Sequence, residues 1–338
     1  MADKVSQSTS QSQTKKVVAL GGGTGTPAVL AGLKNNPQIE LAAIVVVTDS
    51  GGSTGRLRDE FGFLPVGDVR QCITALADDN LAEEIRQLLL YRFGGKSSLK
   101  GHSLGNLIIT AFEDLEHSPG KAIETVSKIF QTKGKIYPVT ETVADLKIEY
   151  DDGSSETGEH FLDDHTIGGK TIKNLSLTKP SPLYPPAKQA LLDADLIVLG
   201  PGDLYGSLIP HALTDGFKEA LQQSSAEFVY VVNLMTHFSQ THQLTAQDHV
   251  DLVTRYFGKQ PDKIIMNDGP IPSELLGSYA KQKEYPVEDD LPHNERVIRG
   301  SFVSEVEVKL NSNDELNRSL LRHDANKLSK ALLDTVLA

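Results

Sequence analysis

Val17–Gly25, with the sequence VVALGGGTG, is a short apolar run that ends abruptly in a cluster of glycines. Thr26 follows as a candidate N-cap and Pro27 as a candidate first helical residue. The stretch therefore predicts a buried strand, a tight turn and a helix. Such a turn suits a phosphate, because glycines let the backbone approach a ligand and a helix start offers free N–H groups. The alternative is a turn that serves only close strand–helix packing, since the dinucleotide fingerprint is incomplete.

Similar apolar runs, each followed by polar or glycine residues, return along the chain. Three of them are Ala42–Val47, Leu196–Leu199 and Phe228–Val232, and Lys263–Met266 is a further candidate. Short runs that are apolar on both faces and alternate with amphipathic helices indicate a parallel sheet covered on both sides. Ligands of such sheets bind outside the carboxyl ends of the strands. We therefore expect an α/β fold with a Rossmann-like, doubly wound, mostly parallel sheet.

The chain is expected to form one domain with a leader and an insertion. Residues 1–14 are rich in Ser and Gln and predict a disordered leader, and residues 15–338 predict a single Rossmann-like α/β domain. The alternating stretches Val143–Tyr150 and Lys170–Leu177 predict antiparallel strands. We therefore place a small antiparallel β insertion at about 134–182.

The C-terminal third is expected to be less regular. Residues 270–294 are rich in proline and acidic residues, which predicts irregular surface structure. Val303–Leu310 alternates like an edge strand, and Leu320–Leu337 has the spacing of a closing amphipathic helix.

Composition argues against several classes of function. The net charge of −12 and the pI of about 5.3 argue against nucleic acid or an anionic membrane as the main partner, but leave room for a small phosphorylated ligand. No apolar run approaches transmembrane length and the N-terminus lacks the form of a signal peptide, so we expect no membrane insertion and a cytoplasmic location.

The single cysteine, Cys72, rules out an internal disulfide and is expected to be buried. The ten histidines show no metal-ligand spacing, so no metal site is predicted.

Asp49 ends the second predicted strand, where dinucleotide-binding folds keep an acid for ribose hydroxyls. It could also hold a divalent metal or polarise an attacking hydroxyl, and the alternative is an Asx-turn before Gly51. Arg56, Arg58 and Arg70 lie near the same loops and could form a phosphate clamp. The alternative for each arginine is a surface ion pair with a neighbouring acid.

Two further stretches carry candidate chemistry. Gly101–Gly105 matches the G-x-S-x-G nucleophile elbow, but a polar loop precedes it where the elbow needs a strand, so a serine hydrolase is not expected. A helix start that presents Ser103 and Asn106 is the better interpretation, with plain capping as the alternative. The Gly200–Ser207 turn predicts a second phosphate or sugar cradle, in which Tyr205 either stacks on a ring of the ligand or packs as a half-buried residue.

Taken together, the motifs resemble those of the YvcK/CofD-like family over nearly all of the chain after residue 15. They are, in chain order, Gly21–Gly25, Asp49–Arg58, Pro65–Arg70, Gly101–Asn106, Gly200–Ser207 and Asn233–Thr236. One branch of this family holds gluconeogenesis factors, and the other holds 2-phospho-L-lactate transferase. The Gly200–Ser207 and Asn233–Thr236 stretches are more similar to the first branch. Ser50 stands where the family commonly has a second acid and Gly206 where threonine is expected, which puts contacts by those side chains in doubt.

The resemblance implies a UDP-sugar-binding regulatory protein of the gluconeogenesis factor type, linked to carbon and cell-envelope metabolism and to cell shape. The alternative is a transferase that moves a phospholactyl group from a nucleotide carrier to a deazaflavin acceptor, with Asp49 as the base and Mg²⁺ on the phosphates. We expect a nucleotide-sugar ligand, no firm catalytic residue, no certain cofactor and a homo-oligomer. The expected ligand-binding residues are Gly22, Gly23, Thr24, Gly25, Asp49, Ser50, Gly51, Gly52, Arg56, Asp68, Arg70, His102, Ser103, Asn106, Gly200, Gly202, Asp203, Tyr205, Ser207, Asn233, Met235 and Thr236.

Overall fold

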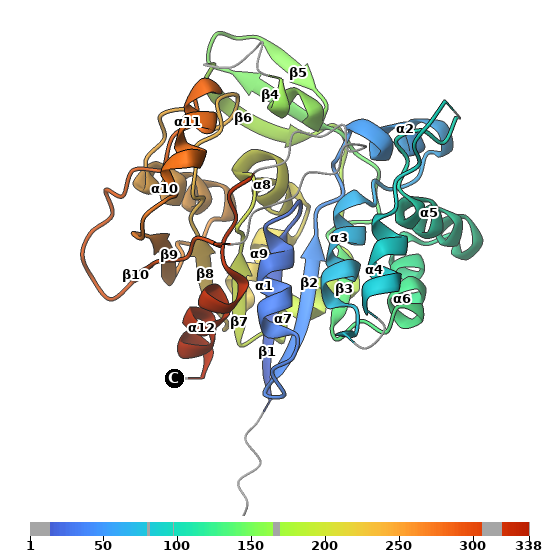
Figure 1. Cartoon of the computed structure of the whole chain (residues 1–338), viewed down its shortest axis with the longest axis horizontal. Coiled ribbons are helices and arrows are strands. Elements are labelled where there is room, and N and C mark those ends of the chain that lie inside the picture. The colour runs from blue at the N-terminus through green and yellow to red at the C-terminus, as the bar shows by residue number, and fades with distance from the viewer. Residues whose placement is uncertain (1–13, 80–81, 97, 165–169, 306–319, 338) are drawn as a thin grey trace, which may run out of the picture.

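The computed structural model describes residues 14–79, 82–96, 98–164, 170–305 and 320–337 (Figure 1). Its centre is a seven-stranded sheet in the order β10-β9-β8-β7-β1-β2-β3, and every pair of neighbouring strands is parallel. The strands are β1 (Lys15–Gly21), β2 (Ile39–Val45), β3 (Lys135–Pro138), β7 (Leu196–Leu199), β8 (Glu227–Val231), β9 (Lys263–Asn267) and β10 (Val297–Gly300). The expected Rossmann-like, doubly wound sheet is confirmed.

The strand order places a topological switch point between β1 and β7. From β1 the chain builds β2 and β3 on one side, and it then returns to the other side of β1 to build β7 to β10. Because all seven strands are parallel, their carboxyl ends lie at the same edge. The loops diverge on either side of a switch point and leave room there for a ligand.

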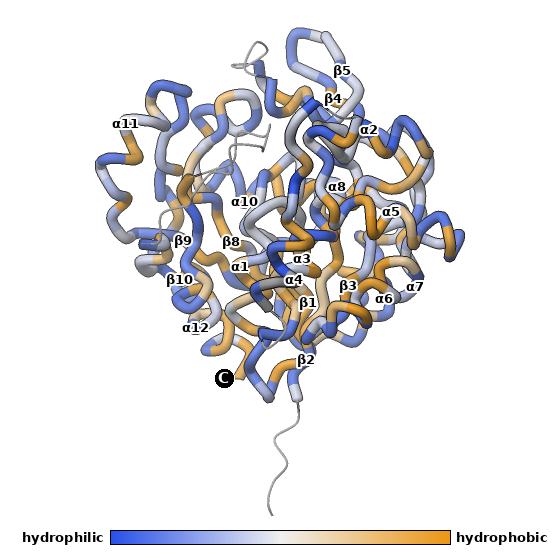
Figure 2. The backbone as a smooth tube through the Cα atoms, turned by 45° about the vertical axis from the view of Figure 1, so that its right-hand side comes forward, coloured by the Kyte–Doolittle hydropathy of each residue, from blue (hydrophilic) through white to orange (hydrophobic). Residues whose placement is uncertain are grey.

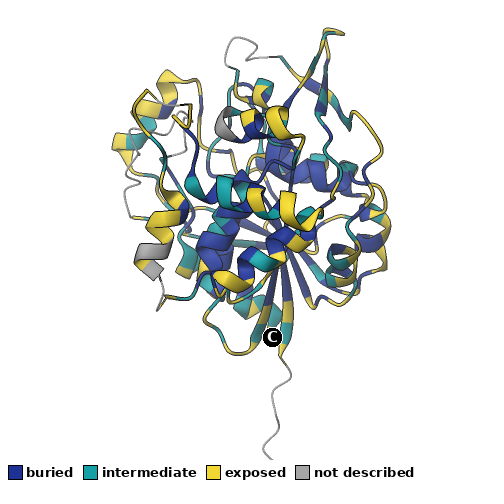
Figure 3. Ribbon diagram, turned by 90° about the vertical axis from the view of Figure 1, so that its right-hand side faces the viewer, coloured by how far each residue is buried: buried dark blue, intermediate teal, exposed yellow. Residues whose placement is uncertain are grey.

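Alternate residues of each strand enter two separate hydrophobic cores. In β1, Val17 and Ala19 belong to one core, and Val18 and Leu20 belong to the other. The first core contains side chains of α1 (Thr26–Leu33), α3 (Gly67–Leu76), α4 (Ala82–Leu90), α5 (Leu104–Glu116), α6 (Pro119–Ile129) and α12 (Ala325–Val336). The second contains side chains of α7 (Pro185–Leu192), α8 (Ile209–Leu213), α9 (Phe217–Gln223) and α10 (Ala246–Phe257). Apolar residues follow the strands in Figure 2, and the strands are the most buried elements in Figure 3.

A small antiparallel sheet forms the expected insertion and lies over the carboxyl edge of the large sheet (Figure 1). Its order is β5-β4-β6, with β4 at Leu146–Tyr150, β5 at Ser155–Thr157 and β6 at Ile172–Leu177. A 3₁₀ helix, η2 (Glu159–Asp163), follows β5. Buried residues such as Ile148 and Leu162 belong to the same core as α8 and α10, so the insertion is packed onto the domain.

Several boundaries differ from those expected. Lys135–Pro138 pairs with β2 in the large sheet, so the start of the insertion near 134 was placed too early. The region 270–294 contains a helix, α11 (Ser273–Lys281), which buries Tyr279 despite the surrounding prolines. The structure adds β10, which the sequence had not indicated. The closing helix begins at Ala325, because the Asp324 carboxylate accepts hydrogen bonds from two backbone N–H groups and caps it.

The remaining expectations concern the chain ends, the cysteine, the first helix cap and membrane insertion. The leader and most of the Val303–Leu310 stretch lie outside the described residues. Cys72 is fully buried, as expected, and burial raises the pKa of its thiol. Thr26 does not cap its helix by a side-chain hydrogen bond, since it is the first residue of α1 and Gly25 holds the N-cap position. No described helix has both the length and the apolar character that crossing a membrane requires.

Candidate functional site

The turns after β1 and β7 touch each other at the switch point. A Cβ placed on Gly25 would lie 2.1 Å from the carbonyl oxygen of Pro201, so a side chain at that position would collide with backbone. Gly23 has a φ of +57°, which favours glycine, and its Cβ position lies 3.5 Å from the Ser207 hydroxyl. The two glycine turns predicted from separate stretches therefore form one continuous surface.

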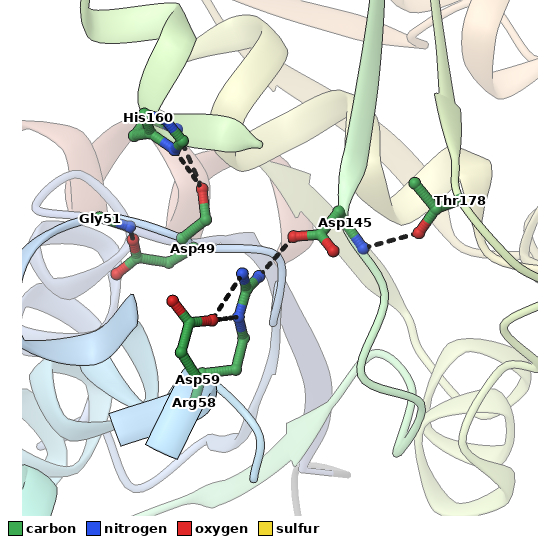
Figure 4. A network of polar contacts seen from close by, with 8 residues as sticks. Asp49, Gly51, Arg58, Asp59, Asp145, His160 and Thr178 are labelled. Atoms are coloured by element: carbon green, nitrogen blue, oxygen red, sulfur yellow. Dashed lines mark hydrogen bonds and ion pairs between the residues drawn. The ribbon is translucent and has the colours of Figure 1, made fainter. Parts of the chain in front are cut away.

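The turn after β2 brings Asp49 toward the start of α3. Asp49 Oδ1 accepts a hydrogen bond of 2.8 Å from the Gly51 backbone N–H, so the Asx-turn is present (Figure 4). Its Oδ2 lies 3.3 Å from the Cβ position of Gly67, the first residue of α3. Asp68, the next residue, places its Oδ2 2.2 Å from the Cβ position of Gly22. Asp49 and Asp68 thus line the approach to the glycine turn after β1.

The turn after β8 joins the same surface through one side chain. Asn233 donates a hydrogen bond of 2.9 Å from Nδ2 to the carbonyl oxygen of Gly202 in the turn after β7. Its Oδ1 is buried and has no hydrogen-bond partner among the described residues. Four turns, after β1, β2, β7 and β8, therefore meet at one edge around the switch point.

The insertion adds residues that the sequence analysis missed. The Ser50 hydroxyl lies 3.0 Å from His160 Nδ1 and accepts a hydrogen bond of 3.1 Å from the His160 backbone N–H (Figure 4). On the other side, the Ser239 hydroxyl donates to the Leu162 carbonyl, and His237 Nε2 lies 3.8 Å from Asp163 Oδ1. The η2 helix is therefore attached to the loops after both β2 and β8. No local pattern in the sequence indicated these contacts.

Arg58 attaches the base of the insertion. Its Nη1 lies 2.6 Å from Asp145 Oδ1, and the Asp145 backbone N–H donates to the Thr178 hydroxyl at 3.0 Å (Figure 4). Arg58 also contacts the neighbouring Asp59, as its alternative interpretation expected. Its guanidinium is therefore engaged in holding the insertion.

Negative charge gathers in this site. Burial raises the pKa of the Glu159 carboxyl well above its usual value, and the charges of Asp49, Asp163, Asp68 and Asp203 raise it further. Glu159 Oε1 lies 3.1 Å from the Cβ position of Gly206, so the insertion brings this carboxyl against the turn after β7. Among the described residues, no group of three His, Cys, Asp or Glu side chains is arranged to hold a metal ion. A phosphorylated ligand would therefore meet both backbone N–H groups and acidic side chains.

The three arginines of the expected phosphate clamp contact different parts of the protein. Arg70 is buried and donates a hydrogen bond of 2.8 Å from Nε to Asn106 Oδ1, and Arg56 donates to the Lys100 carbonyl at 3.0 Å. With Arg58 paired to Asp145, all three side chains already have protein partners. The sequence showed where the arginines lie along the chain but not these partners, and a shared role in holding a phosphate stays a prediction.

The predicted helix start at Gly101–Asn106 is an internal support. The Ser103 hydroxyl accepts a hydrogen bond of 3.1 Å from the Asn106 backbone N–H and caps α5, as the capping alternative expected. Asn106 Nδ2 donates to the Thr54 hydroxyl at 3.3 Å. His102, Ser103 and Asn106 are all buried, and Asn106 connects Thr54 of α2 (Gly52–Phe61) with Arg70 of α3.

The remaining predicted residues divide by exposure. Partly or fully exposed residues are Gly23, Thr24, Gly25, Asp49, Ser50, Gly51, Asp68, Gly202, Asp203, Asn233 and Met235. Tyr205 is 3% exposed and packs in the core, so its ring lies away from the surface and the packing alternative holds. Thr236 is buried and exchanges two hydrogen bonds with the Tyr285 backbone. Met235 forms an isolated bridge with Pro286.

Comparison with known proteins agrees with this architecture. Residues 17–305 match the family described as 2-phospho-L-lactate transferase CofD. The chain is 37% identical over 322 residues to the gluconeogenesis factor of Halalkalibacterium halodurans, covering 95% of this chain and 96% of that protein. It is 35% identical over 326 residues to the gluconeogenesis factor of Bacillus subtilis, covering 95% and 98%. A crystal structure of a UPF0052 family member from Bacillus halodurans has a TM-score of 0.86 at 36% identity, covering 95% of this chain and 99% of that one.

Proposed function

This chain belongs to the CofD family and is similar in sequence to gluconeogenesis factors over most of its length. We propose that it is a regulatory protein that binds a nucleotide sugar, specifically a UDP-sugar, at the switch point. Its role would lie in carbon and cell-envelope metabolism and in cell shape, which are the roles that the resemblance of its motifs to gluconeogenesis factors implies.

The observation that carries this proposal is the contact between the turns after β1 and β7. Gly25 lies directly against the Pro201 carbonyl, and Asn233 holds the Gly202 carbonyl from the adjacent turn. Open α/β sheets bind their ligands in this place, where backbone N–H groups and a helix start face a phosphate. The diphosphate would lie along Gly23–Gly25, beside the start of α1.

The acidic side chains would bind the hydroxyl-rich parts of the ligand. Asp49 is partly exposed and lies at the end of β2, where an acid can accept hydrogen bonds from ribose hydroxyls. Asn233 Oδ1 offers an acceptor without a partner among the described residues. Hydroxyl groups of the ribose or the sugar can donate to both oxygens.

Calorimetry of the purified protein with UDP-glucose, UDP and GDP tests the proposal. We expect UDP-glucose to bind more tightly than UDP, because the sugar hydroxyls add contacts, and we expect GDP to bind more weakly than UDP. Absence of binding to any uridine nucleotide at millimolar concentration would contradict the proposal.

A second candidate function is transfer of a phospholactyl group from a nucleotide carrier to a deazaflavin acceptor. The charges of Asp49, Asp68 and Asp203 each raise the pKa of Glu159, so all three carboxylates face the Glu159 side of the site. Mg²⁺ is commonly held by one or two carboxylates together with substrate phosphates, so a single one of these side chains would suffice to hold such an ion beside the phosphates. Bound Mg²⁺ would neutralise phosphate charge, and Asp49 would accept the proton of the acceptor hydroxyl.

Turnover of a nucleotide-linked phospholactate distinguishes the two candidates. Turnover that is present in the wild type and lost in Asp49→Asn would support the transferase. Binding of UDP-glucose without turnover would favour the regulatory protein. For either function we also propose a cytoplasmic location and a homo-oligomer, which fractionation and light scattering would test.

A further inference from the structure

A fully buried histidine, His211, lies beneath the turns of the candidate site. It belongs to α8, and its side chain is inaccessible to solvent. Nε2 lies 3.0 Å from the carbonyl oxygen of Ile44 in β2, and Nδ1 lies 3.0 Å from the carbonyl oxygen of Leu208. One ring therefore contacts the strand that leads to Asp49 and the segment that follows the turn after β7.

The surroundings hold this ring in place without giving it a charge. Burial lowers the pKa of His211 to about 4, so the imidazole is neutral at pH 7. A neutral imidazole has one N–H and donates to one of the two carbonyl oxygens at a time. The ring also packs edge-on against Phe217, with 5.7 Å between the ring centroids. Its position is thus defined by the strand, the turn and the core together.

Leu208 connects His211 to the glycine turns. Cβ atoms placed on Gly21, Gly200 and Gly202 would lie 3.4, 3.3 and 3.2 Å from the Leu208 side chain. Gly21 begins the turn after β1, and the other two glycines form the turn after β7. The Leu208 side chain therefore packs beneath both turns, and the Leu208 carbonyl oxygen lies 3.0 Å from His211 Nδ1.

Ile44 connects His211 to the turn after β2. It lies one residue before the end of β2, and the next residue after the strand, Val46, donates a hydrogen bond of 3.2 Å to the Gly21 carbonyl. From Val46 the chain continues directly to Asp49. A shift of the Ile44 carbonyl would therefore move the segment that carries Asp49 relative to the glycine turn.

We propose that His211 is a positioning residue of the candidate site, which sets the spacing between the Asp49 turn and the two glycine turns without touching the ligand. The position of His211 follows from its contacts in the structure, and its effect on ligand affinity rests on the proposed function. The affinity for the ligand and the hydrogen exchange of the turns are therefore measured separately.

His249 provides a matched control. It is also fully buried, and burial lowers the pKa of its ring, but Nδ1 contacts only the Thr245 carbonyl of its own helix cap, at 2.8 Å. His249 Nε2 has no partner among the described residues. His249 therefore contacts only its own helix, whereas His211 contacts two separate segments, and the two can be compared directly.

The experiment compares His211→Phe, His211→Gln and His249→Phe. Phenylalanine keeps a flat ring and removes both nitrogens, whereas glutamine keeps a donor near the position of Nε2. Hydrogen exchange of the peptides that cover 17–25 and 46–51 is measured without ligand, and affinity for UDP is measured by calorimetry. We expect His211→Phe to speed exchange in both peptides and to weaken UDP binding at least tenfold. His211→Gln should restore binding to within about threefold of the wild type.

His249→Phe should lower the melting temperature with little change in exchange at the two turns or in UDP affinity. Equal effects of His211→Phe and His249→Phe on the turns would overturn the proposal, as would wild-type exchange in His211→Phe. If wild-type protein binds no uridine nucleotide, the proposed function fails while the exchange comparison still decides the role of His211. Should His211→Phe not fold, His211→Met and His249→Met replace the pair.

Discussion

Asn233, at the end of β8, donates a hydrogen bond of 2.9 Å to the carbonyl oxygen of Gly202, in the turn after β7. The bond links two turns that come from neighbouring strands of the sheet. It also leaves Asn233 Oδ1 buried and without a partner among the described residues. A ligand that donates a hydrogen bond to Oδ1 would complete the set of contacts that this side chain can make.

Asn233→Ala should weaken UDP-glucose binding about tenfold, because both the support of Gly202 and the acceptor at Oδ1 are lost. Stability should fall by about 1 kcal/mol, the usual net value of one hydrogen bond. Calorimetry and thermal unfolding measure the two effects. Asn267→Ala is the matched control, since Asn267 Nδ2 also donates 2.9 Å to a glycine carbonyl, that of Gly269, after the neighbouring strand β9. Weakened binding in both variants would contradict a local role for Asn233.

Gly25→Ala should disrupt the switch point, because its Cβ would lie 2.1 Å from the Pro201 carbonyl oxygen. We expect a loss of stability of about 1–3 kcal/mol from overpacking, together with loss of UDP-glucose binding. Gly277→Ala is the control, since a Cβ in that position of α11 meets nothing within 4 Å and should stabilise the helix by about 0.5–1 kcal/mol. Normal binding by a folded Gly25→Ala protein would show that the ligand lies elsewhere.

Ser50→Ala should loosen the insertion above the site. The hydroxyl contacts both the ring and the backbone N–H of His160, so its removal frees one end of η2. Hydrogen exchange of the peptide covering 155–164 should become faster, while that of the large sheet stays as in the wild type. Ser154→Ala, in the turn between β4 and β5, should leave exchange of η2 unchanged. Equal exchange of η2 in Ser50→Ala and wild type would show that the core contacts of Leu162 and the contacts from Ser239 and His237 hold the helix without Ser50.

Glu113 should make stability fall as pH rises toward neutrality. Burial raises the pKa of this carboxyl to about 7, and its Oε1 accepts a hydrogen bond of 3.0 Å from the Leu64 backbone N–H. The folded state holds a proton between about pH 4.5 and 7 that the unfolded state releases. The stabilisation is complete below pH 4.5 and is lost as pH rises through 7.

Glu113→Gln removes this dependence. The wild type should lose about 3 kcal/mol relative to Glu113→Gln between pH 4.5 and 8, which follows from the size of the pKa difference. Urea unfolding across this range measures the difference. Asp114→Asn, an exposed neighbour on the same helix, should behave like the wild type. Parallel pH profiles for wild type and Glu113→Gln would mean that the carboxyl is ionised in both states.

Local patterns predicted the sheet and its turns but not every element. Val17–Leu20 and Leu196–Leu199 were identified as buried strands because both faces are apolar, and both lie at the centre of the sheet. The cap at Ser103 was foreseen as the alternative interpretation, because a serine before an apolar helical pattern is a local signal. Strand β10 was missed because its four residues lack a continuous apolar run, and only Val297 among them is buried.

Side-chain partners were predicted less well than elements. The partners of two arginines were not foreseen, because Arg58 pairs with Asp145 and Arg70 with Asn106, which lie 87 and 36 residues away along the chain. Tyr205 packs in the core instead of presenting its ring to the surface. Glu159 and His160 were missed, because nothing near them in the chain shows that the insertion folds back over Asp49.

The sequence by itself determined the alternation of strands and helices, the glycine turns and the family, because each depends on short-range patterns that the chain carries locally. Only the tertiary structure decided which turns meet, that His160 reaches Ser50 from 110 residues away, and that His211 lies under the glycine turns. These contacts depend on the packing of whole elements against one another, and no local pattern encodes the partner of a residue in a distant segment.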